Sequence, residues 1–200
     1  MATATHTKIS YEEFLEWAGE DQHVEWVEGE VVPMSPISDR HQQIGAYLLT
    51  LIQLYANMRR LGEVRYEPFQ MKAGPDLPGR SPDILFVAEA NRARLKKTFL
   101  DGPADLAVEI ISPESRARDR GDKFYEYEQG GVSEYWLIDP VREQAEFYQR
   151  GENGFYHPIL PDAQGRYQSA ALPGLWLQVN WLWETPLPPL LDVLKAWGLV

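Results

Sequence analysis

Apolar residues recur three and four positions apart over one long stretch, from Arg40 to Arg60, which is the spacing of a helix with one broad buried face. The apolar members of this stretch are Ile44, Tyr47, Leu48, Leu51, Ile52, Leu54, Tyr55 and Met58. The pattern predicts the longest helix of the chain, with a cap at Ser38 or Asp39 and its end at Gly62.

Two shorter helices follow from local signals. Ser10 and Glu13 have the spacing of a capping box, which predicts a helix through Trp17. A second helix is predicted over Asp119–Gln129, because the pair Gly130–Gly131 behind it can supply the left-handed cap that ends a helix.

Alternating and continuously apolar runs predict the strands. The run Glu25–Met34 turns at a glutamate and a glycine and is predicted to be a hairpin, with Glu25, Glu28 and Glu30 facing solvent. Further strands are predicted at Glu63–Lys72 with an edge or bulge at Pro68, at Ser81–Val87, at Asp105–Ser112, and as a hairpin of Glu134–Asp139 and Glu143–Arg150. Between the strands Ser81–Val87 and Asp105–Ser112, the segment Ala88–Leu100 is polar and basic and is predicted to be a loop or one short helix.

Composition limits the class of protein. The 200 residues suit one domain, residues 1–200, with residues 1–9 as a flexible tail. There is no cysteine, no signal-peptide core and no apolar run of the roughly 20 residues that span a bilayer, so we expect a cytoplasmic protein with no membrane partner. The net charge of −11 argues against non-specific coating of nucleic acid.

The charge is nevertheless uneven. The window Arg92–Lys123 holds eight basic and six acidic residues, so it carries +2 and the remainder of the chain carries −13. Two solvated surface segments would explain this distribution. The alternative is that these basic residues flank an acidic centre and meet a polyanion there.

Two acids lie in runs that otherwise predict buried strands. Asp83 follows Pro82, and Glu109 lies between Val108 and Ile110. Burying an unpaired carboxylate costs several kcal/mol or forces it to take up a proton, so each acid needs a partner. A Mg²⁺ or Mn²⁺ ion bound by Asp83, Glu109 and the backbone carbonyl of Ile110 would provide one.

Such a metal site would suit phosphodiester hydrolysis. The ion can polarise a phosphoryl oxygen and lower the pKa of a bound water, while Lys123 orients that water and balances the developing negative charge. His41, in the first turn of the long helix, and Tyr127, one turn after Lys123, are candidates to line the site.

Ordinary structural roles remain open for each of these residues. Asp83 after a proline could be a turn device, and Glu109 could pair with an arginine. Lys123 and His41 could be surface residues, and Tyr127 could support its neighbours without taking part.

The combination of these residues is similar to the PD-(D/E)xK nuclease superfamily: a PD pair, a following strand with a glutamate, then a lysine. More narrowly, the chain resembles the Uma-two family of small bacterial restriction endonucleases. The segments that carry the resemblance are Glu109–Glu114, the Asp119–Lys123–Tyr127 helix, Gly131–Pro140, Glu28–Gly29–Glu30, Ser35–Pro36 with His41, and Pro173–Gly174–Leu175.

The resemblance implies an α/β domain of the restriction-endonuclease-like kind, with a mixed central sheet, flanking helices and extra β-hairpins. It also implies a metal-dependent DNA endonuclease with Asp83, Glu109 and Lys123 as catalytic residues. The sequence departs from the superfamily pattern at Ile111, where the superfamily has its lysine. The triad is complete only if Lys123 reaches the metal from its helix. A homodimer would present two sites to the two strands of a duplex.

Two rival functions remain. The first is a catalytically inactive nucleic-acid- or protein-binding module, which the net charge favours and which would leave Lys123 out of reach of the carboxylates. The second is a hydrolase that uses two carboxylates without a metal, as in glycoside cleavage, where the acids stand about 5 Å or more apart.

Overall fold

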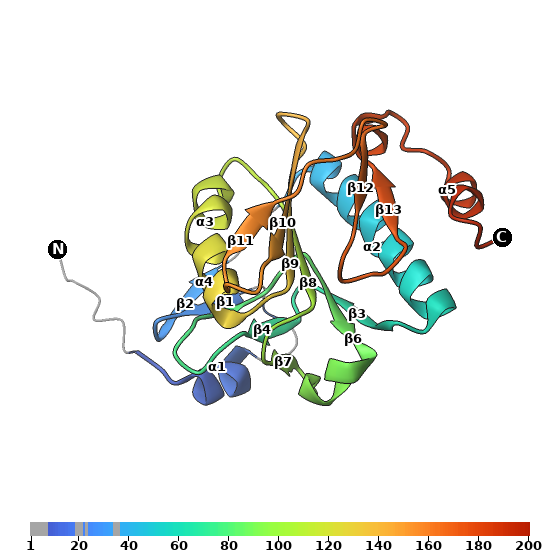
Figure 1. The fold of residues 1–200 in the computed structure, drawn as a ribbon. Coiled ribbons are helices and arrows are strands. Elements are labelled where there is room, and N and C mark those ends of the chain that lie inside the picture. The colour runs from blue at the N-terminus through green and yellow to red at the C-terminus, as the bar shows by residue number, and fades with distance from the viewer. Residues whose placement is uncertain (1–7, 19–21, 23, 34–36) are drawn as a thin grey trace.

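The centre of the protein is a six-stranded mixed sheet in the order β11-β10-β9-β8-β6-β3 (Figure 1). The computed structural model describes residues 8–18, 22, 24–33 and 37–200. Only β8 and β9 run parallel in this sheet, while the other neighbouring pairs within the described residues are antiparallel. The strands are β3 (Gly62–Tyr66), β6 (Ile84–Ala88), β8 (Leu106–Ile110), β9 (Glu134–Asp139), β10 (Gln144–Arg150) and β11 (Tyr156–Pro158).

Helices cover both faces of this sheet. The long helix α2 (Asp39–Arg59) lies on one face, and α3 (Arg116–Arg120) with α4 (Asp122–Gly130) lies on the other (Figure 1). Parallel strands need a crossover connection, and α3 and α4 form the one between β8 and β9. Alternate residues of a strand face opposite sides of the sheet, so Glu109 faces α4 while its neighbours Val108 and Ile110 pack against α2.

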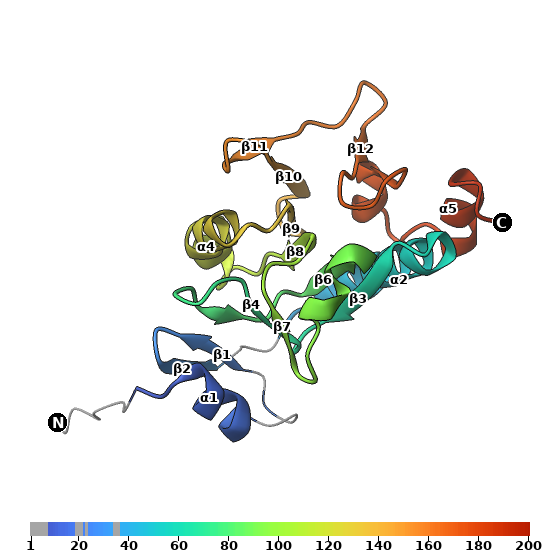
Figure 2. The same ribbon diagram turned by 60° about the horizontal axis from the view of Figure 1, so that its bottom comes forward.

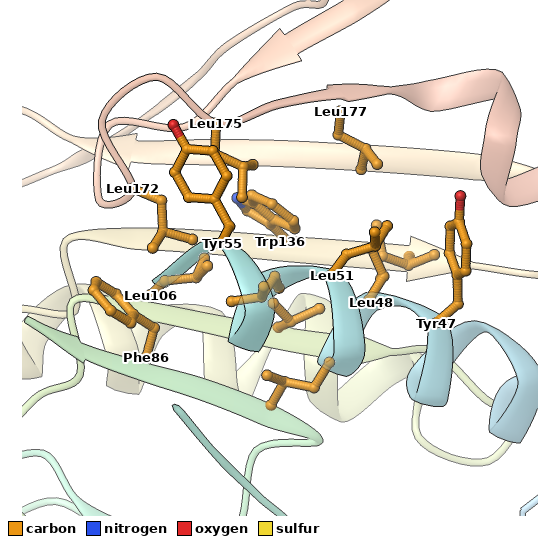
Figure 3. Close-up of a cluster of buried hydrophobic side chains, with 14 of the residues drawn as sticks. Tyr47, Leu48, Leu51, Tyr55, Phe86, Leu106, Trp136, Leu172, Leu175 and Leu177 are labelled. Carbon is orange, nitrogen blue, oxygen red and sulfur yellow. The ribbon is translucent and has the colours of Figure 1, made fainter. Parts of the chain in front are cut away.

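The main hydrophobic core lies between α2 and the sheet (Figure 3). Figure 3 shows Leu48 and Leu51 of α2 beside Trp136 of β9. The C-terminal segment closes this core with Leu172, Leu175 and Leu177, all at most 2% exposed. That segment contains β12 (Arg166–Gln168), β13 (Trp176–Gln178), the 3₁₀ helix η2 (Val179–Trp183) and α5 (Leu190–Ala196).

A second sheet lies beside the first, with α1 packed against it (Figure 2). Its strands follow the order β2-β1-β5-β4-β7. Their bounds are β1 (Val24–Val27), β2 (Glu30–Pro33), β4 (Gln70–Lys72), β5 (Gly79–Arg80) and β7 (Phe99–Asp101); α1 is Tyr11–Ala18 and a 3₁₀ helix η1 spans Glu89–Arg94. This sheet brings Glu25 and Arg80 to the side of the central sheet that carries α4.

Most elements predicted from local signals are confirmed. The capping box that opens α1 is formed: the Ser10 amide donates to Glu13 at 2.7 Å, and the Glu13 amide donates to the Ser10 hydroxyl at 3.1 Å. Ser38 caps α2 by accepting from the His41 amide at 3.2 Å. The β1–β2 and β9–β10 hairpins are both present. The segment Ala88–Leu100, predicted to be a loop or one short helix, contains the 3₁₀ helix η1.

Four predicted boundaries are wrong. Strand β6 begins at Ile84, so Asp83, predicted inside the strand Ser81–Val87, lies just before it. Helix α2 ends at Arg59, and Arg60 rather than Gly62 takes the left-handed cap conformation, with φ of 55°. The predicted strand Glu63–Lys72 is two strands in different sheets, because the chain turns at Pro68, which has no amide proton to donate to a sheet.

The predicted helix over Asp119–Gln129 is also divided. Gly121 has φ of −114° and ψ of −88°, which is not helical, and it separates α3 from α4. Glycine tolerates such a backbone conformation more readily than other residues do. Gly131 then ends α4 in the left-handed conformation, as predicted.

The N-terminal prediction is tested in part. Ile9, assigned to a flexible tail, is bound to the β1–β2 hairpin: its amide donates to Gly29 at 3.0 Å, and its carbonyl accepts from Trp26 at 2.9 Å. Residues 1–7 and the Ser35–Pro36 pair lie outside the described residues. Among the described helices, none combines the length and the apolar character needed to cross a membrane.

Candidate active site

A cleft of about 410 Å³ opens where β8 ends and β6 begins. Its lining is mostly polar and charged: Pro33, Ile37, His41, Gln42, Glu67, Asp83, Glu109, Ile110, Ser112, Glu114, Ser115, Arg118, Asp119 and Lys123. The residues predicted from the sequence to be catalytic, Asp83, Glu109 and Lys123, all line this cleft, and so does His41.

Asp83 lies immediately before β6 and faces β8. The antiparallel register pairs Ile84 with Val108, so one residue further it places Asp83 opposite Glu109. The backbone amide of Ile110 donates to Asp83 Oδ2 at 2.5 Å, and Asp83 Oδ1 lies 3.3 Å from Nε2 of His41. The two acids therefore come together because two neighbouring strands end at the same place.

Glu109 is almost completely buried, at 3% exposure. Its Oε1 atom accepts a hydrogen bond from the Tyr127 hydroxyl at 2.8 Å and lies 2.9 Å from Nζ of Lys123. Burial raises the pKa of Glu109 well above its ordinary value; Lys123 opposes this shift, while the negative charges of Asp119 and Asp83 add to it.

Lys123 extends from the first turn of α4 into this cluster of acids and is 1% exposed. Besides Glu109, its Nζ lies 3.4 Å from Oε1 of Glu25 and 3.5 Å from Oδ1 of Asp119. Burial alone would lower the pKa of Lys123, but the three carboxylates outweigh burial and raise it. Lys123 is therefore an ammonium ion at neutral pH, able to donate hydrogen bonds and unable to act as a base.

The position of Glu25 differs from the one predicted by strand alternation. This residue was expected to face solvent with Glu28 and Glu30; those two are exposed, but Glu25 is completely buried. Besides Lys123, it pairs with Arg80 at 3.1 Å and accepts from the Ser81 amide at 3.3 Å. Alternation along β1 could not reveal this, because the partners that make burial favourable belong to distant parts of the chain.

Arg80, which no sequence pattern indicated, extends the network away from the cleft. Its Nε and Nη2 atoms donate to the two carboxylate oxygens of Glu126 at 2.7 and 2.8 Å, a bidentate pair. Burial alone would raise the pKa of Glu25, but Lys123, Arg80 and Arg118 lower it below its ordinary value. Glu25 is therefore charged, and it ties the second sheet to Lys123.

Of the two residues expected to line the site, His41 lines the cleft, whereas Tyr127 is not among the lining residues and lies behind Glu109. Tyr127 is 1% exposed, and its hydroxyl donates to Glu109, so it orients that carboxylate. Burial alone would lower the pKa of His41, but its hydrogen bond with Asp83 and the charge of Asp83 raise it. Neither residue is on the surface.

The departure at Ile111 has a structural explanation. Ile111 is 1% exposed and packs in the hydrophobic cluster between the sheet and α4, together with Ala107 and Tyr127. Lys123 reaches Glu109 from α4 on the same side of the sheet. The ammonium group expected on the strand is thus supplied by the helix.

The donor set suits a hard divalent cation. A carboxylate offers about four lone-pair positions, and the described contacts leave some of them unused on both acids: Glu109 accepts on Oε1, and no described residue donates to its Oε2. Asp119 Oδ1 is buried without a hydrogen-bond partner. Among the described residues, no group of three or more acidic, histidine or cysteine side chains is placed to hold a metal ion. Mg²⁺ often binds through one or two carboxylates and keeps several waters.

The fold is similar to that of a solved structure. A crystal structure from Anabaena variabilis ATCC 29413, described as that of "a putative nuclease belonging to DUF820", superposes with a TM-score of 0.70 at 19% sequence identity. The superposition covers 88% of this chain and 97% of that one. The α/β architecture with a mixed sheet and flanking helices, predicted from the sequence, is therefore confirmed.

The chain belongs to the Uma2 family, whose description is "Putative restriction endonuclease" and whose model matches residues 11–180. This confirms the resemblance inferred from the sequence. Two proteins of Synechocystis sp. (strain ATCC 27184 / PCC 6803 / Kazusa) are similar to it: "Uncharacterized protein slr1290" is 26% identical over 156 residues, covering 76% of this chain and 80% of that protein. "Uncharacterized protein sll1609" is 24% identical over 156 residues, covering 75% of this chain and 85% of that protein.

Proposed function

We propose that this protein is a metal-dependent endonuclease that hydrolyses phosphodiester bonds of DNA in the cleft between β6 and β8. The observation that carries the proposal is the position of Lys123: its Nζ lies 2.9 Å from Glu109, on a cleft that Asp83 also lines. Two acids and a buried ammonium group at one cleft are the groups that water attack on a phosphodiester requires. The family description and the fold support the same class of reaction.

Each residue has a definite task in this proposal. Asp83, Glu109 and the carbonyl of Ile110 would hold Mg²⁺ or Mn²⁺, which supplies Lewis-acid charge at the phosphoryl oxygen. Lys123 remains protonated, so it donates a hydrogen bond to the attacking water and balances negative charge that develops on the phosphate. Tyr127 holds the Glu109 carboxylate, and the Ile110 amide holds that of Asp83.

The rival without catalysis loses its main structural support. An inactive binding module was expected to leave Lys123 out of reach of Asp83 and Glu109, whereas its Nζ lies 2.9 Å from Glu109 on a cleft that Asp83 also lines. The metal-free rival needs two acids that exchange protons with a substrate. In this cleft, one oxygen of Glu109 is already occupied by an ammonium group and a tyrosine hydroxyl.

Incubation of the purified protein with supercoiled plasmid DNA and Mg²⁺ or Mn²⁺ tests the activity. We expect nicking by the wild type and a loss of at least about 100-fold in Asp83→Asn, because that change removes the charge of a metal ligand and keeps the shape of the side chain. Asp105→Asn is the matched control: this aspartate caps backbone and side-chain amides of Ala88 and Asn91, away from the cleft lining.

Titration calorimetry with Mn²⁺ in the absence of DNA separates metal binding from catalysis. Heat of binding in the wild type that is lost in Asp83→Asn is the expected result. Equal residual nicking by wild type and Asp83→Asn would refute the nuclease. Full cleavage in EDTA together with silent calorimetry would point to the metal-free rival.

A two-fold dimer is part of the proposal, because a duplex has two strands to cut and two related sites would meet them. Light scattering coupled to gel filtration measures the mass directly, and linearisation of plasmid without accumulation of nicked circles would accompany paired sites. A monomer that only nicks would remove the dimer from the proposal and leave the chemistry intact.

A further inference from the structure

Helix α3 is held in place by the two arginines that flank its centre. Arg116 lies 3.2 Å from Asp139, a carboxylate with no exposed side-chain surface. Arg120 lies 3.4 Å from the same carboxylate and 2.5 Å from Glu146. Both guanidinium groups are thus paired with acids of β9 and β10, and α3 is fixed against the sheet.

Arg118 belongs to the same helix and points elsewhere. Residues four apart share a helix face, whereas a residue midway between them lies about 200° around the axis from each. Arg116 and Arg120 face the sheet, so Arg118 faces the opposite side, and it is part of the cleft lining. Reciprocal hydrogen bonds of 3.0 Å between Ser112 and Ser115 fix the turn that leads into this helix.

Arg118 has no partner for its hydrogen-bond donors among the described residues. Its Nε is buried without a hydrogen-bond partner, and no ion pair joins its guanidinium to another described side chain. More than about 90% of buried polar groups in proteins have a partner. An unpartnered guanidinium nitrogen in a cleft is therefore a position where a ligand is expected to bind.

The charges around the cleft indicate which ligand. Lys123 contacts three carboxylates, and the proposed function assigns it to the attacking water. His41 contacts Asp83. Of the cations that line the cleft, Arg118 is the one that keeps its donors for an incoming anion within the described residues. The planar fork of a guanidinium matches two oxygens of a phosphate, a geometry that a lysine ammonium does not offer.

We propose that Arg118 binds a backbone phosphate of the nucleic-acid substrate and holds the strand over Asp83 and Glu109. This inference rests on the proposed function, and it assigns the phosphate contact to one of the basic residues of Arg92–Lys123, which the sequence indicated only as a group. The contact positions the substrate and does not take part in the bond-breaking step.

Fluorescence anisotropy with a short fluorescein-labelled DNA duplex tests the contact, with Ca²⁺ in place of Mg²⁺ to limit turnover. We expect Arg118→Gln to bind about 10-fold more weakly than the wild type, because a charged hydrogen-bonded contact is lost. The slope of log affinity against log salt should become less steep by about one unit. Arg118→Lys should keep most of the salt dependence but not the full affinity, since it retains the charge without the fork.

The matched control is Arg92→Gln, which removes an exposed arginine of η1 whose ion pairs with Glu63 and Glu89 lie at the surface. We expect this variant to bind DNA as the wild type does. Thermal unfolding of Arg118→Gln should stay close to that of the wild type, because no described side chain accepts a hydrogen bond from Arg118, and Glu25, whose pKa Arg118 helps to lower, keeps its ion pairs with Lys123 and Arg80. Should Arg118→Gln not fold, the comparison of Arg118→Lys with the wild type still decides the matter.

The two proposals can fail separately. If the wild type cleaves plasmid while Arg118→Gln and Arg118→Lys show its affinity and salt slope unchanged, the phosphate contact is refuted and the nuclease stands. If the wild type neither binds nor cuts DNA, the proposed function fails and the ligand assigned to Arg118 fails with it.

Discussion

Two of the buried glutamates lie at opposite ends of the parallel strand pair β8–β9, and their carboxylates are satisfied in different ways. Glu134, at the start of β9, is completely buried and accepts hydrogen bonds from five neutral donors at 2.5 to 3.0 Å. The donors are Trp136, Tyr167, Ser169, Ala170 and Ala171. Glu109, at the end of β8, accepts from one hydroxyl and one ammonium group, both on the same oxygen.

The difference separates a structural acid from a candidate catalytic one. A carboxylate has about four lone-pair positions, so Glu134 has none left for a ligand. Its donors belong to β9 and to the chain around β12, and the acid fastens the C-terminal segment to the sheet. Glu109 keeps an oxygen without a described donor and lines a cleft. Burial of a carboxylate alone does not indicate function. A buried carboxylate that lines a cleft and keeps an oxygen without a described hydrogen-bond donor does.

The same contrast explains the most recognisable segment of the family pattern, Gly131–Pro140. Its glutamate is the saturated Glu134, and its aspartate, Asp139, accepts from the amides of Val141 and Arg142 and anchors α3 through Arg116. The part of the sequence that most clearly indicates the family thus builds the frame, and the candidate chemistry lies in the less distinctive residues around it.

Exchange of acid for amide at each of the two glutamates should produce the largest effect and the clearest contrast. We expect Glu109→Gln to lower the rate of plasmid cleavage by about 100- to 1000-fold, because it removes the charge proposed to hold the metal. Glu134→Gln should retain the wild-type rate per folded molecule. Each cleavage rate is divided by the concentration of folded protein, measured by near-UV circular dichroism, so that the two variants are compared per folded molecule. Equal cleavage rates for the two variants would show that Glu109 and Glu134 do not differ in their importance for catalysis.

Removal of the Glu134 side chain should have the next largest effect, this time on stability. Glu134→Ala leaves two amides, two hydroxyls and an indole without their acceptor, and we expect a loss of about 3 kcal/mol or more in the free energy of unfolding. Urea titration followed by tryptophan fluorescence measures it. Cleavage by the folded fraction should continue. A loss below about 1 kcal/mol would mean that the C-terminal segment is held by its apolar contacts alone.

Glu25 connects the frame to the site, so its neutralisation should have an intermediate effect on both. We expect Glu25→Gln to lower the unfolding free energy by about 1 to 3 kcal/mol, because Lys123 and Arg80 each lose one of their carboxylates. Cleavage should fall by about 10-fold, since Lys123 is held less firmly.

The pH dependence of this loss has a definite sign. The pKa of Glu25 is lowered in the folded protein from its ordinary value of 4.5. Its stabilising contribution is therefore complete above pH 4.5 and declines as the pH falls through the lowered pKa. Denaturation curves at several pH values should show the gap between wild type and Glu25→Gln narrow in acid. A gap that widens in acid would contradict the ion pair.

We expect the smallest effects from two tyrosine variants. Each tyrosine hydroxyl donates a hydrogen bond to one of the two glutamates. Tyr127 donates to Glu109 at 2.8 Å, and Tyr167 donates to Glu134 at 2.7 Å. We expect Tyr127→Phe and Tyr167→Phe each to lower stability by about 1 to 2 kcal/mol. Tyr127→Phe should also reduce cleavage several-fold, while Tyr167→Phe leaves it unchanged. If Tyr167→Phe slowed cleavage as much, Tyr127 would have no special role.

Much of the fold follows from local rules. The capping box of Ser10 and Glu13, the long amphipathic helix α2 and the β9–β10 hairpin all form from neighbours a few residues apart. The buried strands at the runs that hold Asp83 and Glu109 were also predictable, whereas the pairing of these strands is a feature of the folded sheet. The predicted boundaries were wrong where a single residue divides a longer periodic stretch into two elements, at Pro68 and at Gly121.

Most elements, the family and the two acids Asp83 and Glu109 could therefore be predicted from the sequence, since periodicity, capping and turn residues act over short distances. The state of the charges depends on the folded arrangement. Whether Glu25 can be buried depends on Arg80, 55 residues along the chain, and on Lys123 beyond it. The free energy of a buried charge depends on every charged and polar group around it in space, and strand alternation carries no information about those groups. For the same reason, folding alone placed Lys123 beside Glu109 and left Arg118 facing the cleft without a described partner.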